Sequence, residues 1–180
     1  ATITYLRKAP TAPVLLPALA KVKPTVMLSV PLIIEKIYKG KVVPSFTKSK
    51  VIKTLYKVPF IRKTLNKVAG KKLVETFGGE LRFFGIGGSK LDETVEKFLR
   101  EAKFPYAIGY GLTETAPMIA GCNPQTTRLQ STGPVMPGVE MKIHKPDPKT
   151  GLGEIWSKAP NTMMGYYKAP ELTKEVITED

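Results

Sequence analysis

The chain has 180 residues, enough for one ordinary domain or for a domain with a small appendage. Hydrophobic residues make up 42% of it and charged residues 24%, and no apolar run approaches the roughly 20 residues of a transmembrane helix, which argues against a disordered or membrane-spanning chain. The net charge of +13 comes mainly from residues 35–72, where twelve Lys and Arg stand against one acidic residue.

The first part of the chain predicts strands and helices in alternation. Residues 1–5 alternate in polarity and predict a short strand, and residues 14–22 predict a helix. The apolar, partly β-branched run 25–30 predicts a strand buried on both faces of a parallel sheet. Pro31 suits the first position of a helix that continues to residue 38.

Residues 49–69 predict a pair of helices. Apolar side chains recur there every three or four residues, which indicates one helical stripe packed on the domain, and Pro59 breaks the helix in two. The stripe consists of Val51, Leu55, Val58, Ile61, Leu65 and Val68.

Two further strands are predicted at 81–86 and 105–110, each ending in glycine, with a helix at 91–103 between them. Strands that alternate with helices imply βαβ units. The predicted fold class is therefore α/β, with a mainly parallel sheet flanked by helices.

The pattern changes near residue 123 to short extended stretches punctuated by Pro and Gly, at 139–144 and 153–158, and a helix returns at 170–176. This pattern predicts a small β-rich, barrel-like subdomain. We therefore assign 1–122 to an α/β subdomain and 123–180 to a second, incomplete one.

The chain has one cysteine and one histidine, which argues against several kinds of catalytic and metal site. Cys122 alone can form neither an internal disulfide nor a thiolate zinc cluster, so the expected location is cytoplasmic. His144 alone leaves almost nothing for a Ser-His mechanism, and its neighbours indicate a surface strand residue.

Ligands of open α/β sheets bind outside the carboxyl ends of the strands, where two loops of this chain are unusual. In the first, residues 85–90, three glycines let the backbone approach a flat ring or a phosphate closely. Lys90 stands where a dinucleotide fingerprint needs glycine, so this loop alone favours a tight turn.

The second loop, residues 108–117, places an aromatic ring between glycines and then a hydroxyl beside a carboxylate. Tyr110 can stack on a base, Thr113 can contact a phosphate oxygen, and Glu114 can bind magnesium, which prefers oxygen ligands. The alternative is a capped helix start with Thr113 as the N-cap. Residue types alone leave both interpretations open.

The segment from Tyr110 to Thr115 resembles the signature loop of the adenylate-forming superfamily. Other segments agree with it in order, namely 87–89, 133–140, 153–156 and 163–167. The run 23–31, followed by 35–38, is similar to AMP-forming long-chain fatty acyl-CoA synthetases in particular. The resemblance covers essentially the entire chain.

This resemblance implies a ligase that activates a long-chain fatty acid with ATP to an acyl adenylate and then transfers the acyl group to coenzyme A. The implied cofactors are ATP and Mg²⁺, with coenzyme A as a substrate. The alternatives are a ligase for another carboxylic acid, or a basic nucleic-acid-binding module suggested by the charge alone.

The resemblance also implies the site residues. Those that bind the nucleotide would be Gly87, Gly88, Ser89, Gly109, Tyr110, Gly111, Leu112 and Thr113. Thr113 and Glu114 would be catalytic, with Thr113 at the α-phosphate and Glu114 as the magnesium ligand, while Gly109 and Gly111 would border the acyl pocket.

The family's phosphate loop, ribose-binding aspartate and C-terminal lysine have no counterpart between Ala1 and Asp180. The resemblance therefore implies a central piece of the large N-terminal domain, which is expected to be inactive when isolated.

The basic segment from Lys36 to Lys72 has three interpretations: a solvated face, a site that attracts the phosphates of coenzyme A, or a surface that lies on an anionic membrane. Nucleic acid is the least favoured partner, because the segment lacks aromatic residues interleaved for base stacking.

Overall fold

The computed structural model describes residues 2–5, 7, 11–47 and 49–178. Residues 2–5 form no strand, so the strand predicted at the start of the chain is wrong there, and Ala1 lies outside the described residues. The polarity alternation of so short a run does not supply a pairing partner, and a strand needs one.

The other predicted elements of the α/β part form, with most ends shifted by one or two residues. The second helix of the predicted pair continues to Thr76 instead of 69, and the short elements Val43–Thr47 and Ala120–Gly121 have no counterpart in the sequence prediction. Its helices are α1 (Ala12–Val22), α2 (Pro31–Ile37), α3 (Val43–Thr47), α4 (Lys50–Leu55), α5 (Pro59–Thr76) and α6 (Glu93–Glu101), with one π-helical turn, Tyr38–Val42, between α2 and α3. Its strands are β1 (Val26–Ser29), β2 (Phe83–Ile86), β3 (Tyr106–Tyr110) and β4 (Ala120–Gly121). No helix of the described residues combines the length and the apolar character that crossing a bilayer requires.

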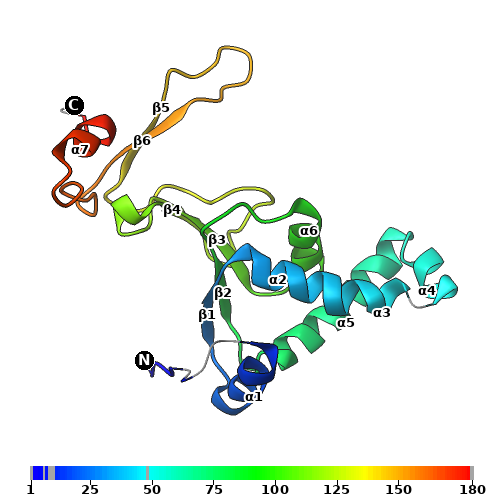
Figure 1. Cartoon of the computed structure of the whole chain (residues 1–180). Helices are drawn as coiled ribbons and strands as arrows, with labels where there is room; N and C mark the ends of the chain where they lie inside the picture. The colour runs from blue at the N-terminus through cyan, green and yellow to red at the C-terminus, as the bar shows by residue number, and fades with distance from the viewer. Residues whose placement is uncertain (1, 6, 8–10, 48, 179–180) are drawn as a thin grey trace.

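The four strands form one sheet in the order β1-β2-β3-β4, parallel except for the antiparallel pair β3–β4 (Figure 1). Helices α2, α5 and α6 contribute side chains to a core against β2 and β3, in which Phe77, Phe84 and Phe104 pack ring against ring. β1 lies at the edge of the sheet and Leu28 is 79% exposed, so the prediction that this strand is buried on both faces is wrong.

The break at Pro59 is confirmed, because α4 ends at Leu55 and α5 begins at Pro59. The predicted apolar stripe is largely wrong, because four of its members are exposed, namely Val51, Leu55, Val58 and Val68. Helix α5 instead buries the face that carries Asn66, Gly70 and Leu73. A Cβ on Gly70 would lie 2.4 Å from the Ala102 carbonyl oxygen, so the absence of a side chain lets α5 pack close to the end of α6.

A polar network makes the burial of this face feasible. The Asn66 side-chain amide donates to Glu101 Oε2 at 2.7 Å, and the Tyr56 hydroxyl donates to Asn66 Oδ1 at 2.8 Å. The Arg62 guanidinium contacts both Glu101 oxygens, at 3.0 and 2.7 Å. The amide oxygen and the amide N–H₂ of Asn66 both have partners, so burying this polar side chain costs little free energy.

The Arg62 hydrogen bond holds the pKa of Glu101 below its ordinary value, which makes a pH-dependent contribution to stability. We expect Glu101→Gln to lower the free energy of unfolding by about 1–2 kcal/mol at neutral pH, the usual range for bonds to a charged group at a partly exposed site. A depressed carboxyl pKa stabilises the fold above its unfolded value of about 4.3, and this contribution is lost as the pH falls through the folded pKa.

Urea unfolding at pH 7 and pH 3 checks this prediction. The difference between wild type and Glu101→Gln is expected to shrink in acid, while the exposed residue Glu93, which pairs with Lys97 on α6, gives a small effect at both pH values when changed to Gln. A difference that persists unchanged at pH 3 would contradict the assigned carboxylate contribution.

The C-terminal part consists of the antiparallel strands β5 (Glu140–His144) and β6 (Glu154–Lys158), followed by α7 (Pro170–Val176). The β5–β6 hairpin projects away from the four-stranded sheet (Figure 1). Two strands cannot close a barrel, so within the described residues the expected barrel-like subdomain is an open hairpin. The division at residue 123 stays a prediction.

Candidate functional site

The carboxyl ends of β2 and β3 lie side by side, because Ile86 pairs with Ile108 in the parallel register. The two glycine-containing loops therefore leave the same edge of the sheet, as their positions in the sequence predict. A Cβ on Gly87 would lie 3.4 Å from the Gly109 carbonyl oxygen, which places the two loop starts in contact. Gly88 has a φ of +90°, a conformation that favours glycine. Ser89 follows it at the exposed surface.

Packing within this chain leaves no room for a side chain at Gly111 and little room at Gly109, on either side of Tyr110. A Cβ on Gly111 would lie 1.5 Å from the Pro117 carbonyl oxygen, which no side chain can occupy. A Cβ on Gly109 would lie 2.9 Å from the Met118 methyl group. The returning segment 117–118 therefore passes directly against this loop and fixes its path.

A single 3₁₀ turn, η2 (Thr113–Thr115), carries the predicted catalytic pair. Its N-cap is Leu112, so the alternative in which Thr113 caps a helix is wrong. The Leu112 N–H donates to Thr115 Oγ1 at 3.0 Å, and Thr115 is buried. Thr115 thus stabilises the turn from inside, whereas Thr113 and Leu112 lie exposed on its outer side.

Glu114 is half-buried and its Oε1 accepts a hydrogen bond from the Tyr166 hydroxyl at 2.7 Å. This bond lowers the pKa of Glu114, and a backbone hydrogen bond at Glu114 lowers it further. The same contact raises the pKa of Tyr166. At neutral pH the site therefore holds a carboxylate anion that is oriented by a neutral phenol.

The donor set fits magnesium bound together with a nucleotide. Magnesium is commonly held by one or two carboxylates plus substrate phosphate oxygens, and an ionised Glu114 supplies one such ligand. Within the described residues no group of three or more His, Cys, Asp or Glu side chains gathers into an all-protein metal site. A metal here would depend on the phosphates for its other ligands.

Sequence reasoning missed the residues that hold the Glu114 turn from the C-terminal side. The Asn161 side-chain amide donates to the carbonyl oxygens of Thr115 and Met118, the latter at 3.1 Å. The Met163 N–H donates to the Glu114 carbonyl oxygen at 2.8 Å. The segment 163–167 resembles a family motif in sequence, but no polarity pattern connects it with a turn about fifty residues earlier.

The chain matches the family described as AMP-binding enzyme over residues 1–167. It is 29% identical to long-chain-fatty-acid–CoA ligase 1 of Saccharomyces cerevisiae, over 90% of this chain and 26% of that protein. It is 31% identical to the peroxisomal long chain acyl-CoA synthetase 6 of Arabidopsis thaliana, over 92% of this chain and 27% of that protein. The chain therefore spans about a quarter of the length of these relatives.

Its fold resembles that of o-succinylbenzoate coenzyme A synthetase from Bacillus subtilis, solved in complex with ATP and magnesium ion. The TM-score is 0.61 at 18% identity, over 94% of this chain and 30% of that one. This broad coverage agrees with the sequence match over residues 1–167. The chain belongs to the AMP-binding enzyme family.

Proposed function

We propose that this chain is part of a ligase that activates a long-chain fatty acid with ATP to an acyl adenylate and transfers the acyl group to coenzyme A. The observation that carries the proposal is the ionised, oriented carboxylate of Glu114, on a turn that leaves the same sheet edge as the glycine loop 87–90. The names of the curated relatives support the fatty acid as the substrate.

In this proposal both loops contact the nucleotide, each at a different part of it. Gly87, Gly88 and Ser89 leave room for the adenine, and the Tyr110 ring stacks on it. Thr113 donates its hydroxyl to the α-phosphate, and Glu114 holds the metal. Magnesium bound with ATP would neutralise negative charge as it shifts toward the departing pyrophosphate.

The remaining predicted residues shape the site. Leu112 links the strand end to the turn that carries Thr113 and Glu114, and Gly109 and Gly111 would border the acyl pocket. The fatty carboxylate attacks the α-phosphorus and pyrophosphate leaves; the coenzyme A thiol then attacks the acyl carbon and AMP leaves, so one thioester forms as one anhydride bond breaks.

Fatty-acid-dependent exchange between ATP and labelled pyrophosphate tests the proposal on the full-length gene product that carries this chain. We expect exchange with palmitate that requires Mg²⁺, and coenzyme A consumption in the complete assay. Exchange only with short or aromatic acids would assign another carboxylic acid as the substrate. The absence of exchange with any carboxylic acid would overturn the ligase function. The 180-residue chain alone is expected to show no turnover.

A membrane surface is a second proposed partner, and it concerns the α4–α5 face. Apolar side chains are exposed there, led by Phe60 at 80%, and the neighbouring lysines Lys53, Lys57 and Lys63 are exposed as well. Exposed apolar groups among cations suit an anionic lipid surface, where each nearby Lys or Arg contributes about 1 kcal/mol. The proposal implies a cytoplasmic protein that associates peripherally with membranes.

Sedimentation with liposomes checks this partner. We expect the full-length gene product to pellet with vesicles that contain phosphatidylserine at low salt, and the double variant Lys53→Glu, Lys57→Glu to lose most of that binding. The matched control is Lys142→Glu, Lys149→Glu in the β5–β6 hairpin, which keeps the net charge change and is expected to retain binding. Equal recovery with and without phosphatidylserine would exclude the membrane partner.

A further inference from the structure

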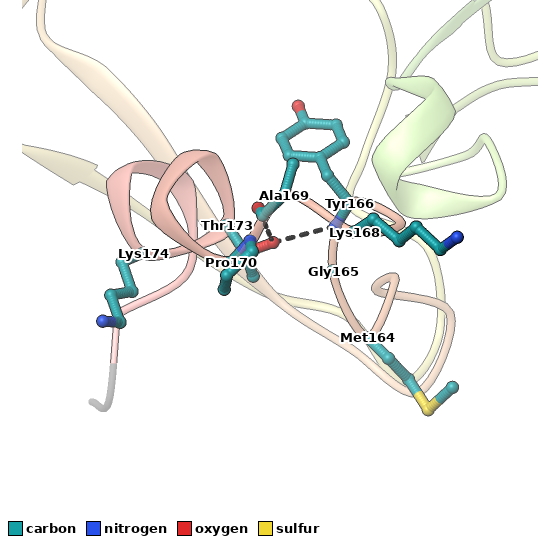
Figure 2. A pocket seen from close by; sticks show the side chains of 8 residues that line it. All are labelled: Met164, Gly165, Tyr166, Lys168, Ala169, Pro170, Thr173 and Lys174. Atoms are coloured by element: carbon teal, nitrogen blue, oxygen red, sulfur yellow. Dashed lines mark hydrogen bonds between the residues drawn. The ribbon is translucent and has the colours of Figure 1, made fainter.

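Tyr166 reaches Glu114 across 52 residues of sequence, and its own position is well fixed. The Tyr166 N–H donates to Thr173 Oγ1 at 2.9 Å, and that hydroxyl donates to the Ala169 carbonyl oxygen at 3.0 Å. Figure 2 shows this pair of bonds in the surface hollow between the 164–170 loop and α7. Helix α7 therefore holds the backbone of Tyr166.

Gly165 allows this arrangement. Its φ is +146°, and a Cβ there would lie 2.8 Å from Thr173 Cγ2. A side chain at this position would push the loop off α7 and move the next residue, Tyr166. The glycine thus sets the direction from which the phenol approaches the Glu114 turn.

The turn is held at several points besides the phenol. Met163 N–H binds the Glu114 carbonyl oxygen, and Asn161 binds two further carbonyl oxygens of the 115–118 segment. The backbone of the turn is therefore fixed by 161–163, and the freedom that remains is the rotation of the Glu114 side chain. The Tyr166 hydroxyl acts on that rotation, because it binds one carboxylate oxygen.

We infer that Tyr166 is a positioning residue, which α7 holds through Thr173 and which fixes the rotamer of the Glu114 carboxylate for metal binding. This inference rests on the proposed function in one respect: the ligand is taken to be a magnesium–nucleotide complex. A carboxylate already held in one orientation loses less conformational freedom when it binds a cation, so its affinity for the metal is higher. Tyr166 itself touches neither the nucleotide nor the reacting atoms in this account.

Tyr166→Phe in the full-length gene product tests the inference, with Tyr167→Phe as the matched control because Tyr167 is 88% exposed. We expect the Mg²⁺ concentration for half-maximal pyrophosphate exchange to rise about three- to tenfold, the loss that corresponds to one ordinary hydrogen bond at a site open to solvent. The exchange rate at saturating Mg²⁺ is expected to change less than twofold. If Tyr166 had only a structural role, Tyr166→Phe would lower the exchange rate at saturating Mg²⁺ and leave the half-maximal Mg²⁺ concentration unchanged.

Hydrogen–deuterium exchange without any nucleotide supplies a readout that does not depend on turnover. Peptides that contain the Tyr166 amide are expected to exchange faster in Thr173→Val than in wild type, because this N–H loses its acceptor. Peptides that cover residues 112–118 are expected to stay unchanged in Tyr166→Phe and in Tyr167→Phe, because Asn161 and Met163 still hold the backbone of the turn. Unchanged exchange of the Tyr166 amide in Thr173→Val, or an unchanged Mg²⁺ requirement in active Tyr166→Phe, would overturn the positioning role. A wild-type protein without pyrophosphate exchange would overturn the ligase function instead, and deuterium uptake would still show whether α7 holds Tyr166.

Discussion

Glu114→Gln is expected to lower Mg²⁺-dependent pyrophosphate exchange by about 100-fold or more. Glutamine keeps the size of the side chain, and its amide oxygen can still accept the Tyr166 hydroxyl, so the fold of the turn should survive. The negative charge is lost, and a neutral amide is a much poorer ligand for a hard dication than a carboxylate. Removing one preorganised electrostatic contact from an active site commonly costs this much.

The control for this variant is Glu75→Gln, which changes an exposed carboxylate on α5 outside the site. Its exchange rate is expected to match wild type, and the melting temperatures of both variants are expected to lie close to the wild-type value. Exchange by Glu114→Gln within about threefold of wild type would remove Glu114 from the metal site. In that case the hydrogen bond with Tyr166 would have only a structural meaning.

Local sequence patterns predicted most elements of the α/β part, because turns, Pro residues and apolar periodicity act over a few residues. Pro59 starts α5 and Pro170 starts α7, both as expected for proline in a first helical turn. The wrong predictions concern which other parts of the fold a strand or helix packs against. The burial of β1 depends on its place at the sheet edge, and the buried face of α5 depends on Gly70 and the paired Asn66.

The candidate site likewise has a part that the sequence predicts and a part that it does not. Its two loops could be predicted from glycines at strand ends, and the parallel register brings those ends together. The clamp formed by Asn161, Met163 and Tyr166 could not be predicted, since it joins segments that are far apart in sequence through backbone and phenol contacts. The roles of the individual site residues stay predictions until the variants are measured.

The second large effect is expected at Glu96, a carboxylate that is fully buried on α6. It accepts hydrogen bonds from the Tyr106 hydroxyl at 3.0 Å and from the Gln130 backbone and side-chain N–H groups at 2.9 and 2.6 Å. Burial and the nearby negative charge raise the pKa of Tyr106, so the phenol stays a donor. One side chain thus joins α6, β3 and the loop that contains Gln130.

Glu96→Ala is therefore expected to lower the free energy of unfolding by about 3 kcal/mol or more. The substitution leaves the buried Tyr106 hydroxyl without its acceptor, which costs about 1–3 kcal/mol, and removes two further bonds from Gln130, an exposed residue whose donors can turn to solvent. A cavity at the former carboxylate adds to the loss. Glu96→Gln should destabilise the fold less than Glu96→Ala, because its amide oxygen can accept from Gln130 while its N–H₂ donates to the Tyr106 hydroxyl oxygen.

Urea unfolding of the full-length gene product measures this loss as a fall in the midpoint at an unchanged slope. Glu93→Ala, one helical turn earlier on the exposed face of α6, is the control and is expected to change stability by no more than about 0.5 kcal/mol. Equal midpoints for the two variants would show that Gln130 finds another acceptor when Glu96 is removed. A selective loss at Glu96 would mean that the loop carrying Gln130 is tied to the four-stranded sheet through one buried carboxylate.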